Sequence, residues 1–168
     1  METLKQKQRK AFVLAGIPGS GKSTWVHDNI EPNFDTYISR DEIRFSLLND
    51  KQAYFEVEDK VKKIYFKEIE QDTKEDGYTY IDATHLNPKS RAITMSHIDP
   101  SNYIIAVSFE VPVQTALVRN SMRMGRARVP DNIIYRMSDS FVIPTLAEGF
   151  DEIWHINTLG HIRKEIKK

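Results

Sequence analysis

The sequence contains no cysteine, which excludes a disulfide scaffold and any metal site built from thiolates. It has no excess charge either, because 24 Lys and Arg balance 24 Asp and Glu, so overall electrostatics favour no class of partner. Apolar runs long enough for a membrane span or a signal-peptide core are also missing. We therefore expect a cytoplasmic protein without membrane contact, with a basic leader at 1–9 and one domain at 10–168.

The most informative stretch is Gly16-Ile17-Pro18-Gly19-Ser20-Gly21-Lys22-Ser23, which fits the phosphate-loop (P-loop) pattern G-x-x-x-x-G-K-[ST]. An apolar run precedes it at 11–15, and a helix-compatible run follows it at 24–30. Glycines let the backbone wrap closely around an anion, and the N–H groups of the next helix then face the phosphates. A dinucleotide-binding turn is the obvious alternative, but these glycines have the wrong spacing for G-x-G-x-x-G.

This loop predicts the contacts to a nucleoside triphosphate and its metal ion. Lys22 should reach the β- and γ-phosphates, and the hydroxyl of Ser23 should bind Mg²⁺. The residues expected to bind the nucleotide here are Gly16, Pro18, Gly19, Ser20, Gly21, Lys22, Ser23 and Thr24.

Strand-like and helix-like segments alternate along the chain. Apolar, β-branched and aromatic runs predict strands at 10–15, 35–39, 78–81, 103–109 and 150–156. Helical patterns predict helices at 24–30, 40–49, 53–75, 87–97, 112–122 and 130–143, and the charged tail through residue 168 is expected to be helical as well. The alternation predicts one α/β domain with a doubly wound, mainly parallel sheet flanked by helices.

In such sheets ligands collect beyond the carboxyl ends of the strands, and three polar residues fall there. Asp41 follows the strand at 35–39, and Arg44 lies three residues further along the same helix face. A carboxylate there can accept the proton of an attacking hydroxyl, and a guanidinium can bind a substrate phosphate. Asp82 ends its strand where phosphate-loop proteins commonly keep an acid for Mg²⁺ or its waters. The alternatives are structural: Asp41 could be a helix-capping acid, Arg44 a surface arginine and Asp82 a turn-forming acid.

A basic segment follows the strand at 103–109 and its helix. Arg119, Arg123, Arg126 and Arg128 fall within ten residues that contain no acid. Mobile arginines that close over ATP stabilise the charge of phosphoryl transfer, so we expect this segment to be an arginine-bearing lid. A solvated basic surface is the alternative.

Four stretches together resemble the polynucleotide 5′-hydroxyl kinases of bacteriophages and bacterial RNA-repair systems. They are GIPGSGKSTW at 16–25, SRDEIR at 39–44, IDATHLNP at 81–88 and VPVQTALVRNSMRMGRARVP at 111–130. The phosphate loop alone is shared widely, and its combination with R-D-x-x-R, the L-N-P turn and R-N-S-x-R makes the likeness specific. The resemblance runs over about residues 11–143 and is to the kinase domain only, because no D-x-D-G phosphatase motif follows.

The resemblance implies that the γ-phosphate of ATP is transferred, with Mg²⁺, to the 5′-OH end of DNA or RNA. Asp41 would be the general base, and Arg44 would bind the 3′-phosphate of the first nucleotide. Arg123 would be the lid arginine that contacts the transferring phosphates, with Arg126 as a helper in nucleotide binding. A chain encoded by a phage would act in the host cytoplasm.

The resemblance also implies substrate contacts for Asp82 and Thr84, although some phage relatives have an Asp where this chain has Ala83. The pattern D-A-T-x-L-x-P recurs in zeta-toxin-like and small-substrate kinases, so a kinase of another hydroxyl, on a modified base, a charged tRNA or a metabolite, is an alternative. A nucleotide-hydrolysing switch is a second alternative, but the chain lacks N-K-x-D and the Asp-Glu pair of motor ATPases. The preference for DNA or RNA, the donor base, the oligomeric state and a separate ligase or phosphatase partner stay open.

Overall fold

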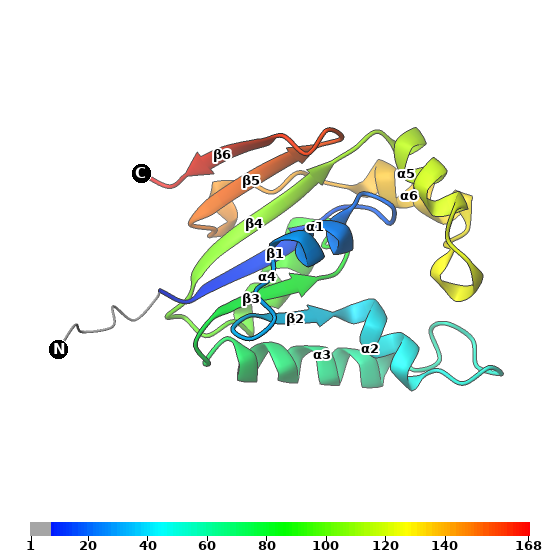
Figure 1. The fold of residues 1–168 in the computed structure, drawn as a ribbon, viewed down its shortest axis with the longest axis horizontal. Coiled ribbons are helices and arrows are strands. Elements are labelled where there is room, and N and C mark those ends of the chain that lie inside the picture. The colour runs from blue at the N-terminus through cyan, green and yellow to red at the C-terminus, as the bar shows by residue number, and fades with distance from the viewer. Residues whose placement is uncertain (1–7) are drawn as a thin grey trace.

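The computed structural model describes residues 8–168, so most of the expected basic leader at 1–9 lies outside the described residues. Within this part of the chain, six strands form one sheet in the order β2-β3-β1-β4-β5-β6 (Figure 1). The strands are β1 Lys10–Ala15, β2 Thr36–Ser39, β3 Tyr78–Asp82, β4 Tyr103–Glu110, β5 Glu152–Asn157 and β6 Ile162–Ile166. The predicted α/β class is confirmed, and the five predicted strands correspond to β1 to β5.

The neighbouring strands from β2 to β5 pair in parallel, and β6 pairs antiparallel with β5. The central strand β1 lies between β3 and β4, with Val13 opposite Ile81 and Ala106. Residues 11–15 are fully or almost fully buried, as expected for a parallel strand that helices cover on both faces. The apolar run that predicted this strand therefore reflects its central position.

Helices lie on both faces of the sheet. They are α1 Lys22–Asn29, α2 Arg40–Leu47, α3 Glu58–Asp72, α4 Pro88–Ser96, α5 Val113–Ser121 and α6 Asp131–Ser140, with short 3₁₀ helices η1 Gly125–Ala127 and η2 Leu146–Glu148. No helix among residues 8–168 is long and apolar enough to cross a bilayer.

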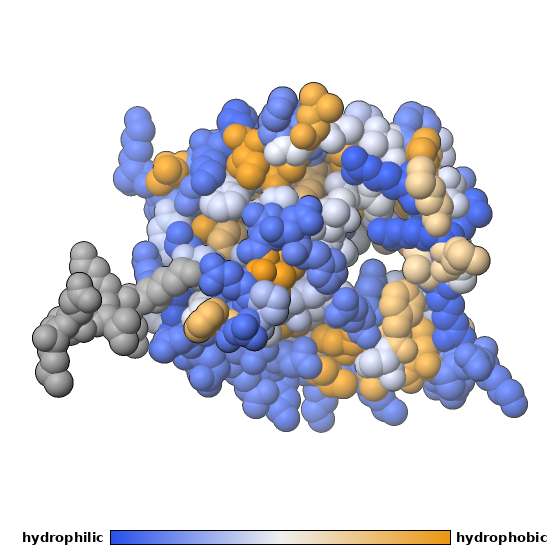
Figure 2. Space-filling view, viewed as in Figure 1, coloured by the Kyte–Doolittle hydropathy of each residue, from blue (hydrophilic) through white to orange (hydrophobic). Residues whose placement is uncertain are grey.

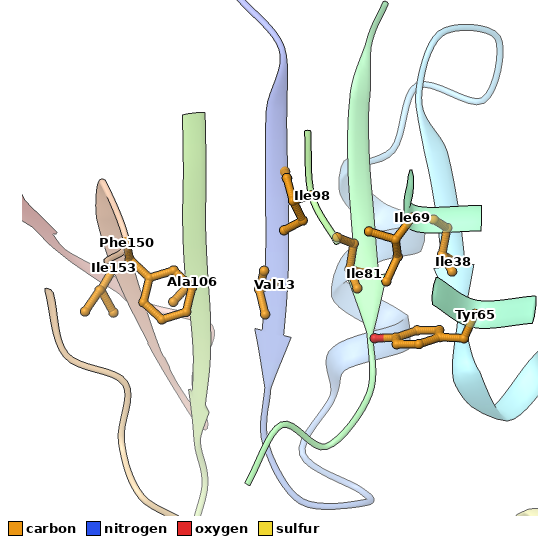
Figure 3. Close-up of a cluster of buried hydrophobic side chains, with 10 residues drawn as sticks. Val13, Ile38, Tyr65, Ile69, Ile81, Ile98, Ala106, Phe150 and Ile153 are labelled. Carbon is orange, nitrogen blue, oxygen red and sulfur yellow. The ribbon is translucent and has the colours of Figure 1, made fainter. Parts of the chain in front are cut away.

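Alternate residues of β1 face two separate cores. Val13 packs in one core with Tyr65 and Ile69 of α3 (Figure 3). Phe12 packs in the other core with Val26 of α1. Helix α1 and helix α3 therefore cover opposite faces of the sheet.

The third helix starts later than its sequence pattern predicts. The predicted helix at 53–75 begins at Glu58, and residues 53–57 form turns instead, with bonds from the Glu56 N–H to the Ala53 carbonyl and from the Glu58 N–H to the Phe55 carbonyl. The hydroxyl of Tyr54 in this segment donates to Asp41 at 2.8 Å. This long-range bond holds Tyr54 against α2, and the helical spacing of the apolar residues cannot reveal it.

The prediction of a helical tail is wrong, because residues 162–166 form the antiparallel edge strand β6. The turn before β6 is built around Asn157, whose side-chain oxygen accepts bonds from the N–H groups of Leu159 and His161, both at 3.0 Å. Gly160 in the turn has a φ of 79°, which glycine adopts without strain. The turn from Asn157 to Gly160 is a hairpin signal, but Ile162 and Ile166, with three charged residues between them, have a spacing that fits a helix as well as a strand.

Gly77 makes the tight connection from α3 into β3. Its φ is 109°, and a Cβ atom added here would lie 1.8 Å from the carbonyl oxygen of Phe34. Any side chain would therefore be strained and would also displace the loop that leads into β2. Gly149 has nearly the same φ, 110°, but no atom lies within 4 Å of its Cβ position.

We predict that Gly77→Ala lowers the free energy of unfolding by about 3 kcal/mol or more, because backbone strain and a steric clash add together. The matched variant Gly149→Ala should cost only about 1 kcal/mol, the strain alone. Urea denaturation of both variants measures the difference. Equal losses would contradict the clash with Phe34.

His85 is a buried histidine in the loop after β3. Its Nδ1 donates to the carbonyl of Leu14 at 2.5 Å, and its Nε2 accepts from the hydroxyl of Thr94 at 3.0 Å. The Tyr65 hydroxyl lies 3.3 Å from the same Nε2. Burial lowers the pKa of His85 to about 4, partly offset by the Leu14 carbonyl. The ring is therefore neutral at pH 7 and joins β1, α3 and α4 beneath the loop.

We predict that the protein loses up to about 3 kcal/mol of stability through His85 as the pH falls from 6.5 towards 4. In this window the unfolded chain, with a pKa of 6.5 for this residue, takes up a proton that the native chain does not. His85→Asn should flatten the pH dependence of the free energy of unfolding, measured by denaturant titration. His161→Asn, which changes an exposed histidine, should keep the wild-type slope. Identical slopes in all three proteins would disprove the assignment.

Candidate active site

The phosphate loop connects β1 to α1 at the carboxyl edge of the sheet (Figure 1). Gly19 and Gly21 have φ values of 80° and 98°, in the region that favours glycine. A Cβ atom on Gly19 would lie 2.4 Å from the carbonyl oxygen of Ala116 in α5. The N–H of Gly16 donates to the carbonyl of Thr84 at 3.0 Å, so the loop after β3 supports the phosphate loop directly.

Lys22 extends back over the loop. Its Nζ donates to the carbonyls of Gly16 at 2.9 Å and Ile17 at 3.1 Å. Burial lowers the pKa of Lys22, the carboxylates of Asp82 and Asp41 oppose this shift, and Arg123 adds to it. Asp82, Asp41 and Arg123 therefore lie within electrostatic range of the Lys22 ammonium group.

Asp82 lies beside the phosphate loop. Its Oδ2 accepts from the hydroxyl of Ser23 at 3.3 Å and from the hydroxyl of Tyr37 at 2.6 Å. Burial and the Asp82 charge raise the pKa of Tyr37, so the phenol stays a proton donor to the carboxylate. The turn-forming alternative is thus incomplete, because this acid is buried and faces the residue expected to bind metal.

Asp41 lies in the first turn of α2, two residues after Ser39, whose side chain caps the helix. The carboxylate contacts Arg44 and accepts from the Tyr54 hydroxyl at 2.8 Å. Its side chain is 63% exposed, which leaves acceptor capacity for a ligand. Since Ser39 is the N-cap, the capping alternative for Asp41 does not hold.

Arg44 is buried, with 5% of its surface exposed, so the surface-arginine alternative is wrong. Its Nε and Nη2 donate to Glu58 Oε2 at 3.3 and 2.8 Å, and its Nη1 donates to the hydroxyl of Tyr54 at 2.9 Å and to Asp41. Burial and the Asp41 charge raise the pKa of Tyr54 to about 12. Glu58 and Tyr54 hold the guanidinium in place, and the guanidinium in turn orients the Asp41 carboxylate.

The arginine-rich segment connects α5 to α6 through η1. Arg123 is half-buried and donates to the Ala127 carbonyl at 3.5 Å, within the segment. Arg126, expected to assist nucleotide binding, donates instead to the carbonyls of Asn49 at 2.7 Å and Gln52 at 3.2 Å in the loop between α2 and α3. The segment therefore reaches across to the side of the site that holds Asp41.

Arg119 contacts the phosphate loop, and the sequence did not predict this contact. Its Nη1 donates to the carbonyls of Gly19 at 3.4 Å and Ser20 at 3.3 Å. Its position in R-N-S-x-R, one helical turn before Arg123, is the signal that marks it in the sequence. Tyr37, Tyr54 and Glu58 were missed as well, because no local motif contains them.

The chain is similar to known proteins in sequence and in fold. The family model described as "AAA domain" (AAA_33) matches residues 12–144. Over 156 residues the chain is 27% identical to a protein of Acanthamoeba polyphaga mimivirus described as a bifunctional polynucleotide phosphatase/kinase, covering 89% of this chain and 33% of that protein. The chain thus spans about a third of the length of this viral relative.

Solved structures of other proteins share the fold. A chain in the structure of the Pnkp1/Rnl/Hen1 RNA repair complex superposes with a TM-score of 0.66 at 21% identity, covering 83% of this chain and 46% of that chain. A gluconokinase from Sinorhizobium meliloti 1021 superposes with a TM-score of 0.59 at 14% identity, covering 88% of this chain and 82% of that one. With the family match spanning most of its length, the chain belongs to the AAA_33 family and has the fold of P-loop kinases.

Proposed function

We propose that this protein is an ATP-dependent kinase that transfers the γ-phosphate to the 5′-OH end of a DNA or RNA strand. The observation that carries the proposal is the exposed Asp41 carboxylate, held by Arg44 at the same edge of the sheet as Lys22. The likeness to the viral polynucleotide phosphatase/kinase and to the RNA repair chain supports a nucleic-acid acceptor.

The loop residues fit a nucleoside triphosphate with Mg²⁺. Glycines let the backbone of the loop adopt positive φ, and Lys22 Nζ lies over the loop carbonyls, from where it would reach the β- and γ-phosphates. Ser23 would hold the metal directly, and Asp82, next to its hydroxyl, would orient a metal-bound water. When bound, Mg²⁺ supplies positive charge to the phosphates. On this geometry Asp82 serves the metal, and Thr84 supports the loop through its carbonyl.

The reaction is an in-line displacement at phosphorus. Asp41 removes the proton of the 5′-hydroxyl, the hydroxyl oxygen forms a bond to the γ-phosphorus, and the bond to the β-phosphate oxygen breaks to release ADP. Lys22 and Arg123 stabilise the charge on the transferring group. Arg44 already donates to Glu58, Tyr54 and Asp41, and its one remaining N–H, on Nη2, would bind a 3′-phosphate of the acceptor's first nucleotide.

A kinase of another hydroxyl is the second candidate, because the gluconokinase from Sinorhizobium meliloti shares the fold. Transfer of labelled γ-phosphate to a panel separates the candidates: 5′-OH DNA and RNA oligonucleotides, a nucleoside 3′-monophosphate, hydroxymethyl-pyrimidine DNA and gluconate. We expect label on the 5′-OH ends. Label confined to a base hydroxyl or to the sugar acid, or ATP loss without any labelled acceptor, would overturn the proposal. Mixing with a separate ligase or 3′-phosphatase then tests partnership in end repair.

We predict that Asp41→Asn lowers the rate of transfer to a 5′-OH oligonucleotide by roughly 10²–10⁴-fold, because the amide cannot accept the proton. ATP affinity, measured by calorimetry, should stay at the wild-type value. Asp139→Asn, which changes an exposed acid on α6, is the matched control and should transfer at the wild-type rate. A loss of ATP affinity in Asp41→Asn equal to the loss of rate would remove Asp41 from the role of base.

A further inference from the structure

Three aromatic side chains gather beside the proposed acceptor site. Phe45 of α2 and Tyr54 lie with ring centroids 6.1 Å apart, and Tyr54 and Phe55 lie 4.8 Å apart and nearly perpendicular at 84°. We call these three residues the aromatic platform. Phe55 is 70% exposed and Phe45 is 36% exposed. Figure 2 shows apolar surface on this side of the molecule, over α2 and the start of α3.

The platform is joined directly to the proposed general base. The hydroxyl of Tyr54 donates to Asp41 at 2.8 Å, and the guanidinium of Arg44 covers the Tyr54 ring at 4.5 Å from its centroid. The Tyr54 ring is thereby fixed, and it supports the edge of the exposed Phe55 ring. Tyr54 thus contacts both the Asp41 carboxylate and the exposed Phe55 ring.

Basic groups lie next to the platform. Arg126 of the lid donates to the carbonyls of Asn49 and Gln52, in the loop that leads into Tyr54 and Phe55. Lys51 is exposed in the same loop. Aromatic rings beside basic side chains are the arrangement by which proteins hold single-stranded nucleic acid, with bases stacked on the rings and phosphates near the charges.

We propose that the aromatic platform binds the nucleobase of the acceptor's 5′-terminal nucleotide, which stacks on the exposed ring of Phe55. The inference rests on the proposed 5′-OH kinase function and adds a contact that a sugar acceptor cannot make. It also requires the terminal base to be unpaired, since a paired base is covered by its partner strand and by the next base pair.

The test compares two 5′-OH oligonucleotides that differ only in the first residue, an adenosine nucleotide or an abasic one. Phe55→Ala should lower kcat/KM for the adenosine-ended strand by about tenfold, through KM, because base–aromatic stacking has this strength. The same variant should leave the abasic strand unchanged. Phe55→Trp should restore wild-type KM, and Phe34→Ala, which removes an equally exposed phenyl ring in the loop before β2, should change neither strand.

Equal losses on both strands, or no loss on either, would overturn the proposal. A wild-type protein that phosphorylates neither strand would contradict the kinase function instead. In that case, the affinity of the protein for the two strands tests whether the aromatic platform binds the base. Fluorescence anisotropy with the same two strands should show that Phe55→Ala binds the adenosine-ended strand about tenfold more weakly than the wild type does. Equal affinity of both proteins for that strand would overturn the proposal.

Discussion

The ion pairs of the buried Arg44 guanidinium with Asp41 and Glu58 are the interactions on which the α2 side of the candidate site depends. Arg40 and Arg44 meet the two carboxylates of Glu58 and Asp41, so two positive charges are matched by two negative ones. An arginine that is 5% exposed requires such partners, because removing one of them leaves an uncompensated buried charge. The pairing sets the path of the chain from α2 into α3, and it leaves the outer oxygen of Asp41 available to a ligand.

The sequence predicts the phosphate loop and the parallel strands well because their signals are local. Eight consecutive residues define the loop, and the central strands are continuous apolar runs because helices cover both of their faces. The sequence also predicts that Asp41 and Arg44 share one helix turn just beyond a strand, and in the structure they contact each other on α2. The position of each depends on residues within a few places along the chain.

The contacts that the sequence does not reveal are long-range. Tyr37 and Asp82 are 45 residues apart, and Arg119 and Ser20 are 99 residues apart. In the sequence, Glu58 is one of many charged residues of a predicted helix, and its bonds to Arg40 and Arg44 of α2 form only in the folded chain. The late start of α3 has the same origin, because a bond from Tyr54 to α2 overrides the helical spacing. The high charge of residues 163–168 favoured a helix in the prediction, but residues 162–166 form a strand because they pair with β5.

The bonds of Arg126 to the carbonyls of Asn49 and Gln52 link the two halves of the site. For the arginine-rich segment to move away from the loop between α2 and α3, these charge-assisted contacts must first break. A ligand that weakens these contacts therefore favours movement of the segment, and that movement in turn strengthens the binding of the ligand by the same factor. The arginine-rich segment and the loop after α2 are thus thermodynamically coupled through the side chain of Arg126.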